Sequence, residues 1–277
     1  METRKIKLED GDYPKKVKQF LTDAGDLFVR GNIDLLEMKS IGIVGSRKCS
    51  AYGRKVTEKV AKICAEENIC VVSGLAYGID AEAHRNAIDN GGKTIAVMAT
   101  GLNMCYPVQN RTLKEKIEKE GLLISEYPDG TEAKKWFFPI RNRIISALSD
   151  IIVVPEANTK SGACITAELA VEQGKRVYAV PSNITSITGM GTNKLIQDGI
   201  EPLIVIDDMF REFLGKNRKS IMNKINLGGD EREILKVLNN YSEVSVDKLC
   251  EETGIVPKDI NGIITVMEMK GIISVSM

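Results

Sequence analysis

Short runs of apolar residues alternate with amphipathic stretches through the chain, and this alternation constrains the fold more than any other feature. The runs are rich in Val and Ile and lack a polar residue at every second position. Strands buried on both faces of a parallel sheet have this composition. The expected strands are 41–46, 69–74, 93–101, 122–128, 150–157, 176–182 and 203–208. The expected helices between them are 51–68, 79–90, 110–120, 140–149 and 161–173.

This alternation predicts an α/β fold with a Rossmann-like, doubly wound and mostly parallel sheet. Ligands of such sheets bind at the carboxyl ends of the strands, near the point where the strand order reverses. The Gly, Ser, Thr and Arg residues that directly follow the strands are therefore the first candidates for a binding site.

A length of 277 residues suggests one large domain with an appendage, or two domains. We expect an N-terminal extension over 1–39, the Rossmann-like domain over 40–214 and a polar linker over 215–227. Residues 228–277 read as three short amphipathic helices and a final strand, which fits a small winged-helix-like domain. A unit of this size is marginal alone, so it is expected to dock on the main domain or on a partner.

The net charge is zero, because 38 Lys and Arg balance 38 Asp and Glu. This excludes a uniformly basic protein of the histone type, but not a local basic groove. From residue 228 onward, five basic residues stand against nine acidic ones, which leaves the rest of the chain near +4. A winged helix that reads DNA needs cations. The acidic module is therefore expected to contact protein, although a few well-placed lysines could suffice for DNA.

Six scattered cysteines with no C-x-x-C pair fit neither a zinc site nor a disulfide framework. They are expected to be reduced thiols in a cytoplasmic protein. The N-terminus lacks a signal-peptide core, and no apolar run approaches the ~20 residues that span a bilayer. We therefore expect no membrane contact, and no metal site is predicted. The single histidine, His84, excludes a site built from several histidines.

The first candidate motif is Gly45-Ser46-Arg47 at the end of the first strand, with Ser50 leading into the next helix. A strand-to-helix turn directs backbone N–H groups at one point, and the added hydroxyl and guanidinium suit a phosphate. A tight turn with a surface arginine is the alternative, and the triplet alone leaves both open. Neither G-x-G-x-x-G nor G-K-[ST] occurs, which disfavours a dinucleotide dehydrogenase and a P-loop ATPase. No cofactor is predicted.

The second motif runs from Ser73 to His84, and its Gly74 allows close approach of the backbone to a ligand. Asp80 and His84 lie one helical turn apart, so their side chains could interact. A catalytic histidine is one interpretation. We favour a structural histidine that is hydrogen-bonded to Asp80.

The third motif runs from Phe138 to Arg143, and its Arg141-Asn142-Arg143 stands at the start of an amphipathic helix. Residues two apart diverge by about 200° on a helix, so only one arginine can face a pocket squarely. Cations in a first turn oppose the helix dipole, which favours an anionic ligand over solvated surface arginines. The preceding Lys-Lys-Trp at 134–136 interleaves cations with an aromatic ring, as single-stranded nucleic acid requires.

The fourth motif, Lys160-Ser161-Gly162, again places Ser-Gly at a helix N-terminus after a strand. It predicts a second anion site on the same edge of the sheet. The alternative is a serine N-cap with nothing bound.

Together these motifs resemble the DNA-processing protein A family (DprA, also called Smf). The matching strings include IVGSR (43–47), SGLAYGIDAEAH (73–84), FPIRNRIISALSD (138–150), SGACITAELA (161–170) and GTNKLIQDG (191–199). The resemblance implies a dimeric protein that binds single-stranded DNA without reading its sequence. It also implies protection of incoming strands in natural transformation and loading of a RecA-type recombinase. The residues it implies for the binding pocket are Ser46, Arg47, Arg141, Arg143 and Lys160.

The chain departs from the family pattern at three places. Pro155 precedes the Glu-Ala pair, so the strand end is expected to be displaced, with an effect on Lys160. Ser182 stands where the family has glycine, and a turn there that needs positive φ would be strained. The family's N-terminal helical domain is missing or reduced to about 40 residues.

The leading hypothesis is a non-enzymatic single-stranded DNA-binding protein that passes DNA to a recombinase. The rival is a nucleotide-binding sensor or an enzyme that resembles the nucleoside monophosphate phosphoribohydrolases. Those enzymes carry a glycine run that is absent from 161–168. A third hypothesis, compatible with the first, is an adaptor whose winged helix recruits a protein.

Overall fold

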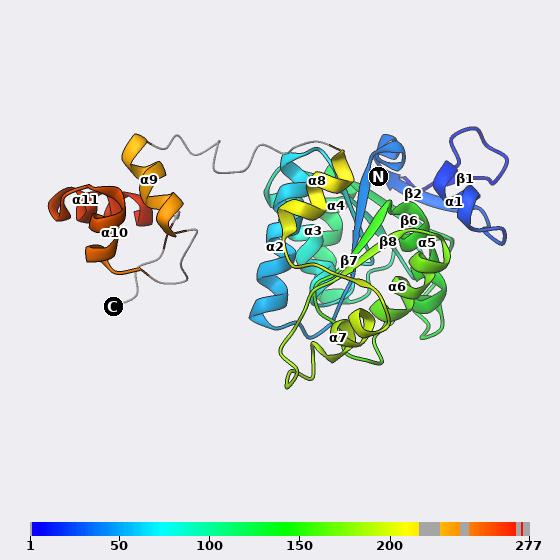
Figure 1. Cartoon of the computed structure of the whole chain (residues 1–277). Coiled ribbons are helices and arrows are strands. Elements are labelled where there is room, and N and C mark those ends of the chain that lie inside the picture. The colour runs from blue at the N-terminus through cyan, green and yellow to red at the C-terminus, as the bar shows by residue number, and fades with distance from the viewer. Residues whose placement is uncertain (1, 216–227, 239–243, 270–272, 274–277) are drawn as a thin grey trace. The chain divides into compact units, whose positions relative to one another are not determined.

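The computed structural model describes residues 2–215, 228–238, 244–269 and 273. These residues divide into two compact units, 1–206 and 207–277, which are described separately below. The expected linker over 216–227 and most of the expected final strand lie outside the described residues. Figure 1 shows the larger unit as a sheet with helices on both faces.

The sheet of the larger unit has nine strands in the order β1-β2-β6-β5-β4-β3-β7-β8-β9. Strands β3 to β9 pair in parallel, whereas β1 and β2 add an antiparallel edge beside β6. The order reverses between β3 and β7, as in a doubly wound sheet. The predicted Rossmann-like fold is therefore confirmed. The strands are β1 (Arg4–Ile6), β2 (Leu27–Gly31), β3 (Ser40–Ile43), β4 (Cys70–Ser73), β5 (Lys93–Val97), β6 (Leu122–Ser125), β7 (Ile151–Val154), β8 (Arg176–Ala179) and β9 (Glu201–Pro202).

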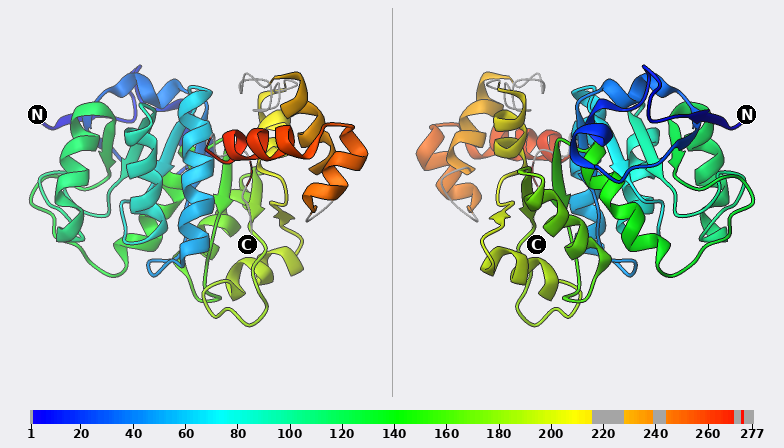
Figure 2. Two further views of the ribbon diagram at one scale, coloured as in Figure 1. Left: turned by 90° about the vertical axis from the view of Figure 1, so that its left-hand side faces the viewer. Right: turned by 90° about the vertical axis from the view of Figure 1, so that its right-hand side faces the viewer.

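Two layers of helices cover the sheet (Figures 1 and 2), with α2, α3 and α4 on one face and α1, α5 and α6 on the other. Apolar side chains of both layers and of the sheet form the buried core. The helices are α1 (Lys15–Phe20), α2 (Ala51–Glu66), α3 (Ile79–Asp89), α4 (Arg111–Glu120), α5 (Phe137–Leu148), α6 (Gly162–Glu172) and α7 (Met190–Gln197), with short 3-10 turns η1 (Ile33–Glu37) and η2 (Val108–Asn110).

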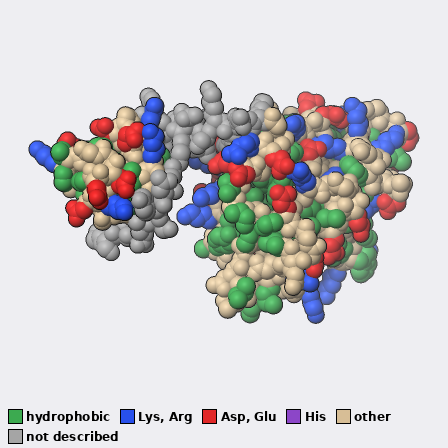
Figure 3. All heavy atoms as spheres, viewed as in Figure 1, with side chains coloured by type: hydrophobic (Ala, Val, Ile, Leu, Met, Phe, Trp, Pro, Cys, Tyr) green, Lys and Arg blue, Asp and Glu red, His purple; other side chains and the backbone are tan. Residues whose placement is uncertain are grey.

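Acidic and basic side chains both occur on the face of the larger unit that Figure 3 presents. Hydrophobic side chains gather on the same face. Several large apolar side chains of this unit stay exposed, among them Tyr52, Ile204 and Val205.

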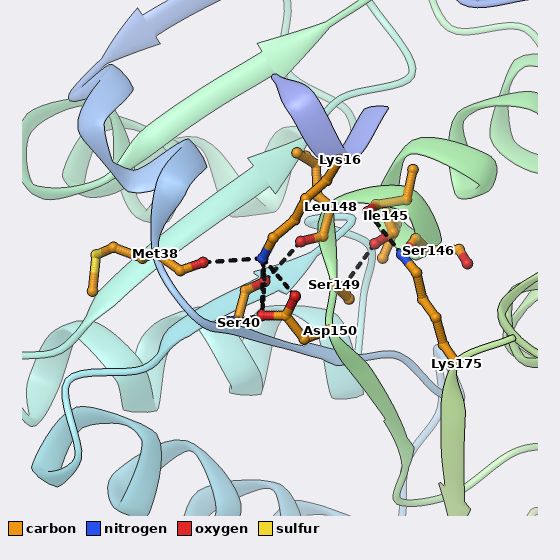
Figure 4. A network of polar contacts seen from close by, with 10 residues as sticks. Lys16, Met38, Ser40, Ile145, Ser146, Leu148, Ser149, Asp150 and Lys175 are labelled. Atoms are coloured by element: carbon orange, nitrogen blue, oxygen red, sulfur yellow. Dashed lines mark hydrogen bonds and ion pairs between the residues drawn. The ribbon is translucent and has the colours of Figure 1, made fainter. Parts of the chain in front are cut away.

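Two partly buried lysine networks stabilise the amino-end edge of the sheet (Figure 4). The Lys16 ammonium of α1 forms an ion pair with Asp150 at 2.7 Å and donates to the Ser40 hydroxyl at 3.1 Å. The Lys175 ammonium donates to the last carbonyls of α5 at 2.6 and 2.8 Å and lies 4.0 Å from the ring centroid of Phe20. These contacts fix α1 and the C-terminal end of α5, whose other end reaches the carboxyl edge.

One predicted strand is wrong. Residues 203–208 do not form a strand, because the edge strand β9 is only Glu201–Pro202 and α8 (Ile206–Leu214) begins within the expected run. Asp207 and Asp208 lie in the first turn of α8, where carboxylates stabilise a helix N-terminus. The short strands β1 and β2 were not predicted, because their segments contain few consecutive apolar residues.

Neither expected distortion at the strand ends is present. The pairing of β7 with β8 extends to Val154, and Pro155 follows only after this last pair, where no ladder donor is needed. Ser182 does not adopt a positive φ among the described residues. Its N–H instead donates to Asn193 Oδ1 at 2.9 Å, and its carbonyl accepts from Asn193 Nδ2 at 2.9 Å. The expected strain at Ser182 is therefore wrong.

The described part of the smaller unit contains three further helices, α9 (Gly229–Leu238), α10 (Val246–Thr253) and α11 (Pro257–Met269). They pack around a core of four buried side chains, Ile234, Leu249, Ile260 and Met267. Ser245 caps α10, and Gly254 ends it in the left-handed conformation at φ 72°. Across the described residues of both units, no helix is long and apolar enough to cross a membrane.

Candidate functional site

A cavity of about 780 Å³ opens at the carboxyl ends of β3 and β7, where the strand order reverses. This is the place where doubly wound sheets bind ligands. Its walls are the loop after β3, the first turns of α5 and α6, and the loop before α7. The predicted site residues that line it are Gly45, Ser46, Arg47, Arg141, Asn142, Lys160, Ser161 and Gly162.

Cations outnumber acids among the charged residues that line this cavity. Its charged residues are the cations Arg47, Lys48, Lys135, Arg141 and Lys160, together with one acid, Asp80. All of these cations except Arg141 are exposed, and no carboxylate within the described ranges forms an ion pair with the exposed four. Such a wall attracts an anionic ligand.

Arg141 lines the cavity, but only 4% of its surface is exposed. Its guanidinium donates to the carbonyls of Gly74, at 2.7 Å, and of Val97. Burial lowers the pKa of Arg141 to about 10, an effect that the Asp80 carboxylate opposes. Arg141 therefore stays charged at neutral pH. Gly74 does not line the cavity. A Cβ there would lie 2.5 Å from the guanidinium, so this glycine makes room for Arg141.

Arg143 points away from the cavity. Its guanidinium forms ion pairs with Asp23 at 3.0 Å and Glu126 at 2.6 Å. The expected divergence of Arg141 and Arg143 on the helix is thus present, and α5 directs Arg141 toward the cavity. The binding role predicted for Arg143 has no support from this placement.

Ser50 does not line the cavity either. Its hydroxyl caps α2 by accepting from Gly53 N–H at 3.1 Å, and its own N–H donates to the Glu156 carboxylate at 2.8 Å. The N-terminus of α2, expected to be an anion site, therefore already faces an internal carboxylate. Glu156 is a site residue that the sequence motifs did not predict. A lone acid two residues after a wholly apolar strand is the signal that could have identified it.

The N-terminus of α6 forms another part of the cavity wall. The Ser161 hydroxyl accepts from Ala163 N–H at 3.1 Å, which is the N-cap of the simpler interpretation. Asn142 donates to the Gly162 carbonyl at 3.1 Å and so joins α5 to α6. Lys160 is exposed beside this N-terminus.

The expected hydrogen bond between His84 and Asp80 is wrong. His84 Nδ1 lies 2.7 Å from the Thr94 hydroxyl, and His84 is completely buried outside the cavity lining. Burial lowers the pKa of His84 to about 3, so the ring is neutral. Asp80 instead accepts from the N–H groups of Gly74 and Ala76, and burial raises its pKa while Arg141 lowers it. Within the described ranges, no three acidic, Cys or His side chains lie close enough to hold a metal.

Aromatic rings lie at one side of the cavity, and only Trp136 among them was singled out from the sequence. Phe138 lines the cavity, 5.2 Å from the Arg47 guanidinium and 5.4 Å from the Tyr106 ring. Trp136 is 62% exposed and Tyr106 is 46% exposed. Exposed rings beside cations provide stacking surfaces.

These features define a Rossmann-like α/β protein with a cation-lined cavity at the reversal of its strand order. The family model described as DNA recombination-mediator protein A matches residues 4–214, and the DprA winged helix domain matches 222–275. The chain therefore belongs to the DNA recombination-mediator protein A family, and its C-terminal module is a winged helix. Both the resemblance and the fold class predicted from the sequence are confirmed.

Named relatives agree with this assignment. DNA processing protein DprA of Streptococcus pneumoniae is 42% identical over 74% of this chain and 72% of its own length. The Bacillus subtilis protein is 39% identical over 76% and 72%. The solved structure of the pneumococcal protein has a TM-score of 0.73 over 77% of this chain and 75% of that one. A Helicobacter pylori DNA processing protein A, described for its single-stranded DNA binding mode, has a TM-score of 0.70 and 29% identity, over 76% of this chain and 96% of that one.

Proposed function

We propose that this protein binds single-stranded DNA in the cation-lined cavity, without reading its sequence. The observation that carries the proposal is the ratio of five cations to one acid around an open cavity at the sheet's reversal point. Arg47, Lys48, Lys135 and Lys160 are exposed and suit successive phosphates of a strand. Arg141, buried beneath them, adds a fixed positive charge.

The bases of the bound strand stack on the rings beside the cavity. Tyr106 and Trp136 are exposed and Phe138 is half-buried, and Arg47 and Lys134 lie close to the Phe138 and Trp136 rings. Stacking tolerates every base, because each has a π face. This arrangement supports binding that is independent of the DNA sequence. It also assigns base stacking to the aromatic residues, a role that the sequence motifs alone did not indicate.

The family description as a recombination mediator supports a further step, in which the protein protects the strand and loads a RecA-type recombinase. Natural transformation or DNA uptake in the cytoplasm is the setting that we propose. The acidic winged helix supplies a surface that suits a protein partner rather than DNA, as the charge count suggests.

A homodimer is part of the same proposal. Apolar side chains, among them Tyr52, Leu203 and Ile204, line a small groove on the larger unit together with Lys55 and Lys59, and Ile204 is 72% exposed. Burying such a surface against a second copy is favourable. Sedimentation equilibrium tests this, and a strict monomer at micromolar concentration would contradict the homodimer.

A nucleotide hydrolase is the less favoured function. The string at 161–168 lacks the glycine run of those enzymes, and Glu168 does not line the cavity. His84 is buried and neutral, so it offers no general base to the cavity. We therefore propose a non-enzymatic role.

Fluorescence anisotropy with labelled oligo-dT and a mixed-sequence oligonucleotide of equal length tests the proposal. We expect micromolar or tighter binding at ~50 mM salt, similar for both strands, and a steep loss as salt rises. Absence of binding at micromolar protein would contradict the DNA-binding role. Release of free adenine from AMP in a parallel incubation would favour the hydrolase instead.

A further inference from the structure

One residue holds both ends of the loop that carries Arg47. Ser46 N–H donates to the backbone carbonyl of Glu156 at 2.7 Å. At the other end of the loop, the Ser50 N–H and hydroxyl donate to Glu156 Oε2 at 2.8 and 3.1 Å. The exposed cations Arg47 and Lys48 lie between these two attachment points.

Two glycines are required by the closeness of Glu156. A Cβ at Gly45 would lie 2.7 Å from the Glu156 carbonyl oxygen, and a Cβ at Gly53 would lie 2.2 Å from Oε2. Neither glycine has a positive φ, so each is needed for space and not for backbone conformation. The glycine of the Gly45-Ser46-Arg47 motif therefore makes room for both the Glu156 carbonyl and the Ile79 side chain, whose Cγ1 would lie 2.6 Å from a Cβ.

The negative charge of Glu156 does not favour the binding of an anionic ligand in this cavity. Its side chain is buried, with 3% of its surface exposed, and a carboxylate there repels a phosphate strand. The N-terminus of α2 and the two hydrogen bonds from Ser50 stabilise the buried carboxylate. The two effects of Glu156 on DNA affinity can therefore be separated. Its contacts with the loop are expected to strengthen DNA binding, whereas its negative charge is expected to weaken it.

We propose that Glu156 is a positioning residue for DNA binding, which fixes residues 46–50 in the conformation that presents Arg47 to the strand. This inference rests on the proposed function. It also assigns the N-terminus of α2 to Glu156, so that the Arg47 side chain and not the helix end meets the phosphate.

Glu156→Ala and Glu156→Gln separate the two effects in the full-length protein. Glu156→Ala is expected to weaken oligo-dT binding about tenfold and to lower its salt slope by about one, although it removes a negative charge. Glu156→Gln keeps an acceptor oxygen for Ser50 and is expected to bind at least as tightly as wild type. The matched control is Glu168→Ala, an exposed acid of α6 that holds no loop, with unchanged or slightly tighter binding expected.

Gly53→Ala supplies a second variant, which displaces the carboxylate without removing it. Alanine normally favours a helix over glycine, so helix propensity alone predicts no damage. We expect weaker DNA binding from Gly53→Ala and no further loss when it is added to Glu156→Ala, since no carboxylate is then left to displace. If circular dichroism shows that Gly53→Ala or Glu156→Ala folds poorly, the other variant still tests the proposal.

Hydrogen exchange of residues 46–50 gives a readout that needs no DNA. We expect faster exchange of this segment in Glu156→Ala and wild-type exchange in Glu156→Gln. If Glu156→Ala binds DNA as tightly as wild type, or Glu156→Gln as weakly as Glu156→Ala, the positioning role is overturned. Failure of the wild-type protein to bind DNA would instead contradict the proposed function. The hydrogen exchange of residues 46–50 would still test whether Glu156 fixes the loop.

Discussion

Two arginines of α5, Arg141 and Arg143, are two residues apart in the sequence and have different structural roles. Arg141 is buried, donates to strand-end carbonyls and brings a fixed charge to the cavity wall. Arg143 pairs with Asp23 and Glu126 and holds the N-terminal segment against α5. Helical geometry predicts their divergence from the sequence. It cannot say which one faces inward, because Asp23 and Glu126 are distant in the sequence.

Replacement of Arg141 by alanine is expected to destabilise the fold. The change leaves the carbonyls of Gly74 and Val97 without this donor and the buried Asp80 without its neighbouring cation. We expect a loss of about 3 kcal/mol in the free energy of unfolding, measured by urea denaturation. Arg85→Ala, which removes an exposed ion pair to Glu82, is the control and should change stability by less than about 0.5 kcal/mol.

His84 predicts sensitivity of the fold to acid. Burial holds its pKa at about 3, below the ordinary value of 6.5, so the unfolded chain takes up a proton first as the pH falls. The stability that neutral His84 contributes is complete above pH 6.5 and is lost progressively toward pH 3. We expect about 1.5 kcal/mol of this loss between pH 6.5 and 5. Urea denaturation of His84→Gln should show a smaller loss over that interval, and equal losses would contradict the assignment.

At the scale of elements, buried parallel strands are the part of the fold that the sequence predicts best, because nearly every residue of such a strand is apolar. The prediction fails over 203–208, where two acids begin α8. It also omits β1 and β2, edge strands whose pairing depends on β6 and not on local pattern. Pro155 and Ser182 show the same limit, since the contacts that accommodate them come from other elements.

The C-terminal end of α5 depends on Lys175. Its ammonium donates to two carbonyls of the last turn and lies against Phe20. Lys175→Met is expected to lower the free energy of unfolding by about 1–2 kcal/mol, because both carbonyls lose a donor. Lys62→Met, at an exposed position of α2, should leave thermal stability unchanged. If Lys175→Met melts at the same temperature as wild type, Lys175 does not stabilise the C-terminal end of α5.

At the scale of the whole molecule, a net charge of zero conceals an acidic stretch over 228–277, which is balanced by four cations and no acid over 215–227. The residues that line the cavity all lie between 44 and 188, within the larger unit. The sequence motifs predicted eight of these lining residues, since strand ends share one edge of a parallel sheet. They could not predict Glu156 or Tyr106, whose roles depend on contacts between separate loops.

A chain that ends at residue 214 tests this division. Because the proposed DNA contacts lie in the larger unit, we expect the shortened chain to bind oligo-dT within about threefold of the full chain. Circular dichroism confirms that the shortened chain is folded. A loss of affinity greater than about tenfold in a folded protein would instead show that the winged helix takes part in DNA binding.

The salt dependence of oligo-dT binding tests the central claim most directly, by comparison of wild type, Arg47→Ala and Arg143→Ala. Arg47 is exposed in the cavity wall, whereas Arg143 is paired outside it. We predict that Arg47→Ala weakens binding and lowers the slope of log K against log salt by about one, and that Arg143→Ala leaves the slope unchanged. An unchanged slope for Arg47→Ala would contradict a strand bound in this cavity.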